Sequence, residues 1–132
     1  MTYGIALTTL LVRDYDEAIE FYTKGLGFEV SADQTTNTGA GEPKRWVEVR
    51  PPGGSSGLLL AKADGAEQEA LVGQQFGGRV GLFLHVKDFD AAYASMKDKV
   101  KFLEEPRSEP YGKVVVFQDL YGNQWDLMEP RS

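Results

Sequence analysis

The pattern of hydrophobic and polar positions occurs twice along the chain. The stretch 7–28 (LTTLLVRDYDEAIEFYTKGLGF) returns in degraded form at 81–102 (GLFLHVKDFDAAYASMKDKVKF). Val12 and Val86 end the two apolar runs, and subtracting 12 from 86 gives an offset of 74. In each copy an apolar run is followed by an Asp and then by apolar residues at helical spacing. This order is typical of a buried strand, a turn and an amphipathic helix. The repetition therefore predicts two copies of one structural unit.

Each predicted helix begins after an Asp. Asp14 is followed by Glu17, as in a capping box, and Asp88 occupies the equivalent place in the second copy. The apolar stripes are Ala18, Phe21, Tyr22 and Leu26 in the first helix and Ala92, Met96 and Val100 in the second. We therefore expect helices over 15–25 and 89–99.

The remaining apolar runs predict the strands. They are expected at 4–12, 28–32, 44–50 and 58–61 in the first half, and at 80–86, 101–104, 113–118 and 124–128 in the second. Residues 34–43 are polar and glycine-rich and predict a connection or hairpin. If Val47 and Val49 face the helices, the alternation in 44–50 (KRWVEVR) places Trp46, Glu48 and Arg50 on the opposite face of the sheet.

These elements predict an α+β fold. We expect one domain over 1–132, made of two βαβββ modules at about 4–64 and 79–130. The linker 65–78 between them contains a helical turn or two at 66–74. Two such modules would form a curved mixed sheet around a central cavity.

Composition narrows the classes of function. The 132 residues include no Cys, which excludes disulfides, thiolate catalysis and Cys-based zinc sites. The net charge of −6 argues against a nucleic-acid partner. No apolar run approaches the ~20 residues of a membrane span, and the amino terminus does not resemble a secretory signal. We therefore expect a cytoplasmic protein whose partner is a small molecule.

Two motifs indicate a family. One is Val12-x-Asp14 followed by Ala18-x-x-Phe21-Tyr22 and Leu26-Gly27-Phe28; the other is Tyr111-Gly112 followed by Phe117-x-Asp119-x-x-Gly122-Asn123-x-Trp125-Asp126-Leu127. With these motifs the chain resembles the vicinal oxygen chelate superfamily, which includes glyoxalase I, bleomycin-resistance proteins, fosfomycin-modifying enzymes and extradiol dioxygenases. The family usually has Asp-Pro-Asp-Gly-Asn in the last turn, where this chain has Leu120 and Tyr121 in place of the Pro and the second Asp.

The resemblance implies a divalent metal held by His or Glu at four strand positions, two in each module. These positions fall at Leu7, at Leu59 or Leu60, at Gly81 and at Asp126. Only Asp126 offers a ligand atom, whereas a catalytic metal needs about three protein ligands. His85 would lie about 13 Å along the strand from Gly81 and cannot replace the missing ligand. We therefore expect neither a metal nor another cofactor.

Strand parity and the resemblance together predict a cavity with apolar walls and a few polar contacts. Its candidate ligand-binding residues are Leu7, Thr9, Trp46, Glu48, Phe83, His85, Tyr111, Gln124 and Asp126. Asp126 is the candidate hydrogen-bond acceptor or general base, and burial would raise its pKa. Alternatively, it pairs with Arg45 or Arg50, or lies exposed at a rim.

The other candidates also have structural interpretations. His85 could be a structural hydrogen-bond partner, Glu48 could pair with Arg50 at the surface, and Tyr111 could pack on the rim. Trp125 has the opposite parity to Asp126 and is expected in the core. Gln75 and Phe76 of the linker could form a lid edge.

Three hypotheses for the function follow. The first is a metal-independent protein that binds a small, partly apolar molecule, as bleomycin-resistance proteins do, with a cationic, antibiotic-like compound as one candidate. The second is a glyoxalase-type lyase, isomerase or dioxygenase with a reassigned metal site. The third is an accessory domain that dimerises and regulates a partner. The resemblance also implies a homodimer.

Overall fold

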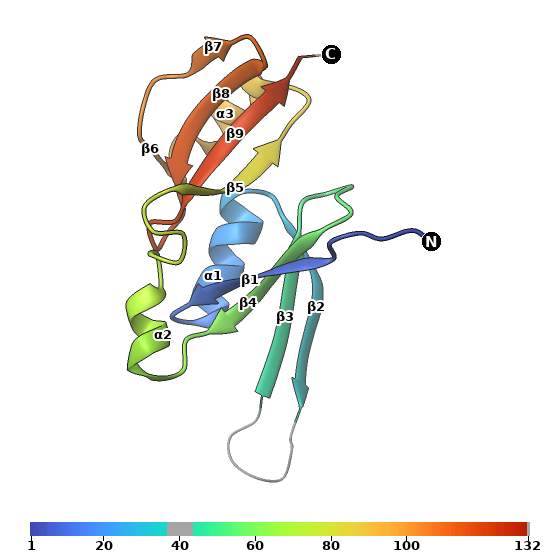
Figure 1. Ribbon diagram of the computed structural model, residues 1–132, viewed down its shortest axis with the longest axis vertical. Helices are drawn as coiled ribbons and strands as arrows, with labels where there is room; N and C mark the ends of the chain where they lie inside the picture. The colour runs from blue at the N-terminus through green and yellow to red at the C-terminus, as the bar shows by residue number, and fades with distance from the viewer. Residues whose placement is uncertain (37–43, 132) are drawn as a thin grey trace. The chain divides into compact units, whose positions relative to one another are not determined.

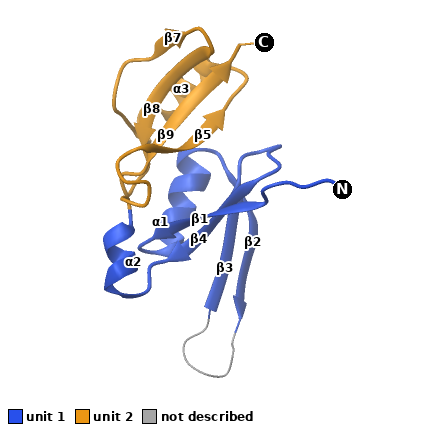
Figure 2. Ribbon diagram, viewed as in Figure 1, with its two compact units in different colours: residues 1–72 blue, residues 73–132 orange. Residues whose placement is uncertain are grey.

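The computed structural model describes residues 1–36 and 44–131. The chain divides into two compact units, residues 1–72 and 73–132 (Figure 2). The helical part of the linker belongs to the first unit, and the remainder of the linker belongs to the second. Each unit has its own sheet and helix, and each is described by itself.

The first unit contains a four-stranded mixed sheet (Figure 1). Its elements are β1 (Leu7–Val12), α1 (Tyr15–Glu20), the π-helical turn η1 (Phe21–Gly25), β2 (Glu29–Thr36), β3 (Lys44–Arg50), β4 (Gly57–Lys62) and α2 (Gly65–Leu71). The strand order is β1-β4-β3-β2, with β1 and β4 parallel and the other neighbours antiparallel. The chain from β1 to its parallel partner β4 includes the first helix and the strands β2 and β3, which is long enough for the crossover that a parallel pair requires.

The first helix begins and ends as the sequence predicts. The Asp14 carboxylate accepts a hydrogen bond from the Glu17 backbone N–H at 2.8 Å. Gly27 ends the helical segment with a φ of 75°, a conformation that glycine adopts without strain. The buried core of this unit is formed by Leu10, Val12, Ala18, Tyr22, Phe28, Val47, Val49, Leu58 and Leu60. The predicted parity of Val47 and Val49 is thus confirmed.

The second unit repeats this topology with a five-stranded sheet. Its elements are β5 (Val80–His85), α3 (Phe89–Met96), β6 (Lys101–Phe102), β7 (Arg107–Glu109), β8 (Gly112–Gln118) and β9 (Gln124–Pro130). The order β5-β9-β8-β6 is that of the first sheet, and β7 adds to β8. The Asp88 carboxylate caps α3 through the Ala91 N–H at 3.1 Å. The predicted α+β class and the two mixed sheets are confirmed.

Aromatic side chains fill the core of the second unit. Successive ring centroids lie 6.0, 4.5, 6.2 and 5.7 Å apart along the series Phe89, Tyr93, Phe102, Phe117 and Trp125. Such distances are favourable for aromatic pairs. Trp125 is 3% exposed, which confirms its predicted place in the core.

Several predicted boundaries were wrong. Strand β1 begins at Leu7 rather than at residue 4, α2 ends at Leu71 rather than 74, and α3 ends at Met96 rather than 99. Strand β2 runs to Thr36, because its polar end pairs with β3 through the backbone, which needs no apolar side chain. The rest of the predicted 34–43 connection, 37–43, lies outside the described residues.

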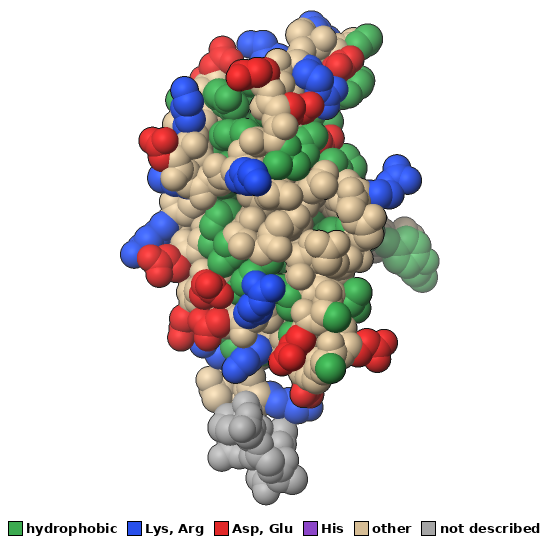
Figure 3. All heavy atoms as spheres, turned by 90° about the vertical axis from the view of Figure 1, so that its left-hand side faces the viewer, with side chains coloured by type: hydrophobic (Ala, Val, Ile, Leu, Met, Phe, Trp, Pro, Cys, Tyr) green, Lys and Arg blue, Asp and Glu red, His purple; other side chains and the backbone are tan. Residues whose placement is uncertain are grey.

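The predicted strand 101–104 contains only two strand residues, and β7 was not predicted. The three residues of β7, Arg-Ser-Glu, have no apolar member and so give no strand signal. No helix of the described residues is both long and apolar enough to cross a membrane. On the face seen in Figure 3, acidic and basic side chains are interspersed and form no block of one sign.

Candidate functional site

The sheet of the first unit has one face without a helix, which we call the first open face. Strand register places Thr9, Leu59, Glu48 and Ala32 in one row across it. Leu7 and Trp46 share this parity, so four predicted site residues lie on one face. Trp46 is 46% exposed. This face combines apolar and polar side chains.

Glu48 is held by its neighbours on this face. It accepts hydrogen bonds from Trp46 Nε1 at 2.6 Å and from Arg50 Nη2 at 3.1 Å, and Ser31 Oγ lies 3.5 Å away. The hydrogen bond from Trp46, followed by the interaction with Arg50, lowers the pKa of the Glu48 carboxyl. The predicted alternative in which Glu48 pairs with Arg50 is confirmed. Its carboxylate is therefore an ionised anchor for the Trp46 ring.

The second unit has an equivalent face, the second open face. Register places Phe83, Asp126 and Val116 in one row, and His85, Met128 and Val114 in the next. Phe83 is 61% exposed and His85 is also exposed. Gln124 pairs with Gln118 in a third row. The predicted residues Phe83, His85, Gln124 and Asp126 therefore lie on one face of one sheet.

Asp126 is the distinctive group of the second open face. Its Oδ1 atom is buried and has no hydrogen-bond partner among the described residues. Burial raises the pKa of the Asp126 carboxyl, against a smaller lowering by the charge of Arg107. Arg45 and Arg50, the cations considered from the sequence, bind Asp33 and Glu48 instead. The raised pKa agrees in direction with the prediction.

Sequence reasoning missed the charged cluster near Asp126. Arg107 donates through Nε to Glu104 at 3.0 Å and through Nη1 to Glu109 at 2.8 Å. Glu104 also accepts the Val116 backbone N–H at 3.0 Å. Tyr111, 53% exposed, hydrogen-bonds to Arg107, and these contacts raise the pKa of the guanidinium. The only sequence signal was the alternation of charge at 104, 107 and 109, which begins at the last residue of the predicted strand 101–104 and continues in a segment to which no element was assigned.

The implied metal positions offer few ligands. Leu59 lies on the first open face, whereas Leu60 is buried on the helix side. In the second unit a register shift follows Val80, and Gly81 is passed over in the pairing with β9. A Cβ at Gly81 would lie within 3.0 Å of the Phe76 ring, so this ring fills the space of a side chain at position 81. Residues 1–36 and 44–131 contain no group of three acidic, His or Cys side chains that could hold a metal ion.

The segment before β5 reaches the second sheet through glycines. Gly73, Gly77 and Gly78 all have positive φ, and they bend the chain so that Phe76 reaches Gly81. The predicted lid-edge residue Phe76 thus packs on β5.

The turn between β8 and β9 is organised by Asp119. Its Oδ1 accepts the backbone N–H groups of Tyr121, Gly122 and Asn123 at 2.9, 3.1 and 3.0 Å. Its Oδ2 accepts Asn123 Nδ2 at 2.9 Å. Asp119 and Asn123 are 6% and 2% exposed. The Asp119 and Asn123 of the second sequence motif therefore fix the start of β9, and with it the place of Asp126.

Comparisons with known proteins cover nearly the whole chain. The model of the glyoxalase/bleomycin resistance protein/dioxygenase superfamily matches residues 4–127. An uncharacterized protein of Shewanella frigidimarina is 47% identical over 131 residues, 98% of this chain and 95% of that protein. The uncharacterized protein YetH of Bacillus subtilis is 30% identical, over 98% of this chain and 100% of that protein.

Two solved structures have the same fold over almost their full length. The structure of UcmS2 is 31% identical with a TM-score of 0.80, covering 98% of this chain and 99% of that chain. TnmS3, an antibiotic binding protein from Streptomyces sp. CB03234, is 28% identical with a TM-score of 0.76, covering 98% of both chains.

Proposed function

Because the chain belongs to the glyoxalase/bleomycin resistance protein/dioxygenase superfamily, we propose that it binds a small, partly apolar, antibiotic-like molecule without a metal ion. The observation that carries this proposal is the full-length similarity to TnmS3, which is an antibiotic binding protein. The exposed Phe83 side chain of the second open face supports it, and so does the buried Asp126 Oδ1 atom, which has no hydrogen-bond partner among the described residues, since small-molecule sites combine apolar walls with few polar groups.

The charges on the second open face favour a cationic ligand. Arg107 is already bound by Glu104 and Glu109, so one positive charge faces two carboxylates before Asp126 is counted. Asp126 therefore adds to an excess of negative charge rather than neutralising a cation. A protonated amine would give the buried Oδ1 atom a charged donor, which is a strong kind of hydrogen bond. Phe83, in register with Asp126, would cover the apolar part of the same ligand.

The residues at the implied metal positions do not fit a divalent metal. Leu7 and Leu59 have no ligand atoms, and the place of a third ligand at Gly81 is filled by the Phe76 ring. Asp126 alone cannot supply the about three protein ligands of a catalytic site. The lack of metal-ligating side chains at these positions supports recognition of the ligand by protein side chains and not by a metal ion.

Replacing Asp126 with Asn tests this proposal. We expect the protein, after treatment with EDTA, to bind metal-free bleomycin or another cationic antibiotic of a titrated panel in isothermal calorimetry. Asp126→Asn should weaken that binding about tenfold or more, because a charge-assisted hydrogen bond is worth about 1.5–3 kcal/mol. Asp64→Asn is the matched control, because Asp64 makes no side-chain cap bond at α2. Stoichiometric metal that survives EDTA and is lost in Asp126→Asn would favour the glyoxalase-type enzyme instead.

The same variant gives a test of the Asp126 environment that needs no ligand. Burial raises the folded-state pKa of Asp126 above the ordinary 3.8, so the ionised form is disfavoured in the folded protein. Its contribution to stability is present at low pH and is lost as the pH rises through the folded pKa. Asp126→Asn should therefore be more stable than the wild type at pH 7, and the difference should shrink as the pH falls toward 3.8. A less stable variant at pH 7 would make the ionised carboxylate structural.

We also propose that the protein is a cytoplasmic homodimer. Strands β1 and β5 each end their sheet's strand order, and each has a partner on one side only within its described sheet. Such edges favour pairing with a further strand. Light scattering should give twice the chain mass of 14.6 kDa at micromolar concentration. A particle of 14.6 kDa would contradict the dimer.

A further inference from the structure

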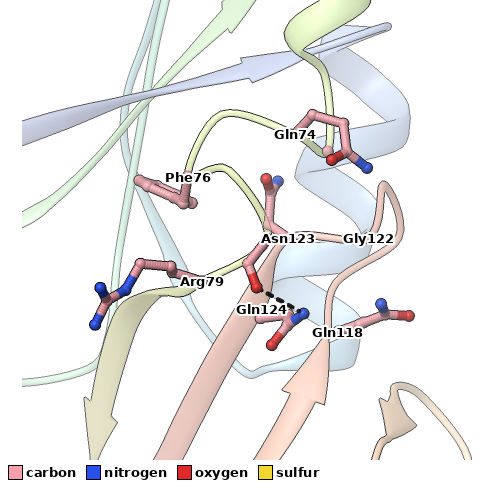
Figure 4. Close-up of a pocket in the computed structure, with 9 residues that line it drawn as sticks. Gln74, Phe76, Arg79, Gln118, Gly122, Asn123 and Gln124 are labelled. Carbon is pink, nitrogen blue, oxygen red and sulfur yellow. Dashed lines mark hydrogen bonds between the residues drawn. The ribbon is translucent and has the colours of Figure 1, made fainter.

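A small pocket lies at one end of the second open face. It has a volume of about 80 Å³ and is lined by Gln74, Phe76, Arg79, Gln118, Asn123, Gln124 and glycine backbone (Figure 4). This volume has room for more than one water. Gln124 precedes Asp126 by two residues on β9, so the pocket begins about 7 Å from the Asp126 position along the strand. We call it the amide pocket, because four of these side chains are carboxamides.

Asn123 lines the amide pocket and contains an unused acceptor. Its Nδ2 donates to Asp119 Oδ2 at 2.9 Å. Because a carboxylate only accepts, this bond fixes which way the Asn123 amide is turned. Oδ1 is consequently directed away from Asp119, and it is buried without a hydrogen-bond partner in the described part of the chain, in a residue only 2% exposed. A buried acceptor of this kind favours a ligand or water that brings a donor.

The amide pocket has no acidic lining residue. Gln124 Nε2 already donates to the Gly78 carbonyl at 3.3 Å, and Gln74 and Gln118 can each present either an oxygen or an NH₂ group. Figure 4 shows the Arg79 guanidinium extending away from Asn123 and Gln118. An ammonium group would find no carboxylate among the lining residues, and a carboxylate group would bring no donor for Asn123 Oδ1. A neutral group with both an N–H donor and a C=O acceptor matches this lining.

We propose that the amide pocket binds a neutral carboxamide group. If the amide pocket is a subsite for the molecule that Asp126 binds, this proposal rests on the proposed function. The pocket adds a second polar contact to that ligand. The ligand class becomes a molecule with an amine for Asp126 and, about 7 Å away along β9, a primary or secondary amide. The pocket has backbone walls, because a Cβ at Gly73 would collide with the Tyr121 carbonyl oxygen.

Acetamide is the probe that tests the pocket without the unknown ligand. We expect acetamide titrated into ¹⁵N-labelled full-length protein to shift the side-chain amide signals of Gln118 and Asn123 and the backbone signals of Gly78 and Gln124. The shifts should saturate with a dissociation constant on the order of millimolar, the scale available to so few atoms. Acetone, which lacks the donor, and acetate, which is charged, should bind at least tenfold more weakly. Equal shifts from all three, or no saturable shift, would overturn the proposal and leave the pocket to water.

Two variants test whether acetamide binds in the amide pocket. Gln118→Met keeps the length of the side chain and removes the amide, and it should weaken acetamide binding about fivefold or more. Gln34→Met, on β2 of the first unit, is the matched control and should leave it unchanged. A Gln118→Met protein that binds acetamide as the wild type does would overturn the assignment. If an antibiotic binds through Asp126 but acetamide does not bind, the subsite is wrong and the proposed function stands; if acetamide alone binds, the proposed function is wrong and the carboxamide site stands.

Discussion

Replacing Asp119 with Ala should lower the free energy of unfolding of the second unit by about 3 kcal/mol. The substitution removes the acceptor of three backbone N–H groups and of the Asn123 amide, at distances of 2.9–3.1 Å. Each such bond contributes about 1 kcal/mol net, and donors left buried cost more. In a Trp46→Phe background the remaining Trp125 lies in the core of this unit, so its fluorescence during urea denaturation reports the effect.

Two further variants separate the hydrogen bonds from the charge. Asp119→Asn keeps one side-chain oxygen, which can still accept from the backbone N–H groups. The new NH₂ group can donate to Asn123 if the Asn123 amide turns over. The expected loss in the free energy of unfolding is therefore about 1 kcal/mol. Asp64→Ala removes a carboxylate that makes no cap bond and should cost less than about 0.5 kcal/mol. A loss below about 1 kcal/mol for Asp119→Ala would show that the turn keeps its shape without this side chain.

Replacing Gly81 with His should destabilise the second unit by about 2 kcal/mol, because the new side chain and the Phe76 ring require the same space. Phe76→Ala removes the obstacle. In the double variant the loss of stability should be at least about 1 kcal/mol smaller than the sum of the two single losses, which is the signature of direct contact. Urea denaturation of the four proteins in the Trp46→Phe background measures this coupling.

Gly4→His is the matched control for this cycle. Nothing lies within 4 Å of a Cβ built at Gly4, so that substitution should leave stability unchanged. Additive losses in Gly81→His and Phe76→Ala would contradict the packing of the ring on position 81. The same cycle bears on the proposed function. If the two substitutions are coupled, a metal-ligating side chain at position 81 fits only when the Phe76 ring moves away.

The sequence pattern predicted much of the fold because it reports which face of each element is buried. The 74-residue repeat predicted two copies of one unit with the same order of elements along the chain, and the parity of Val47, Val49 and Trp125 was correct. The caps at Asp14 and Asp88 were also correct, because a cap is a contact between residues three apart. Polar strands such as β7 were missed, because a strand that pairs through backbone hydrogen bonds does not need a periodic pattern of apolar residues.

The sequence by itself determined the repeated units, their core faces and the carboxylate at position 126, because burial periodicity and helix caps are local properties of the chain. Only the tertiary structure decided what surrounds that carboxylate. The register shift after Val80, the three glycines that bring Phe76 onto Gly81 and the binding of Arg107 by Glu104 and Glu109 all depend on which strands align and at which residue. Contacts across strands are set by register, which alternation along one strand does not encode.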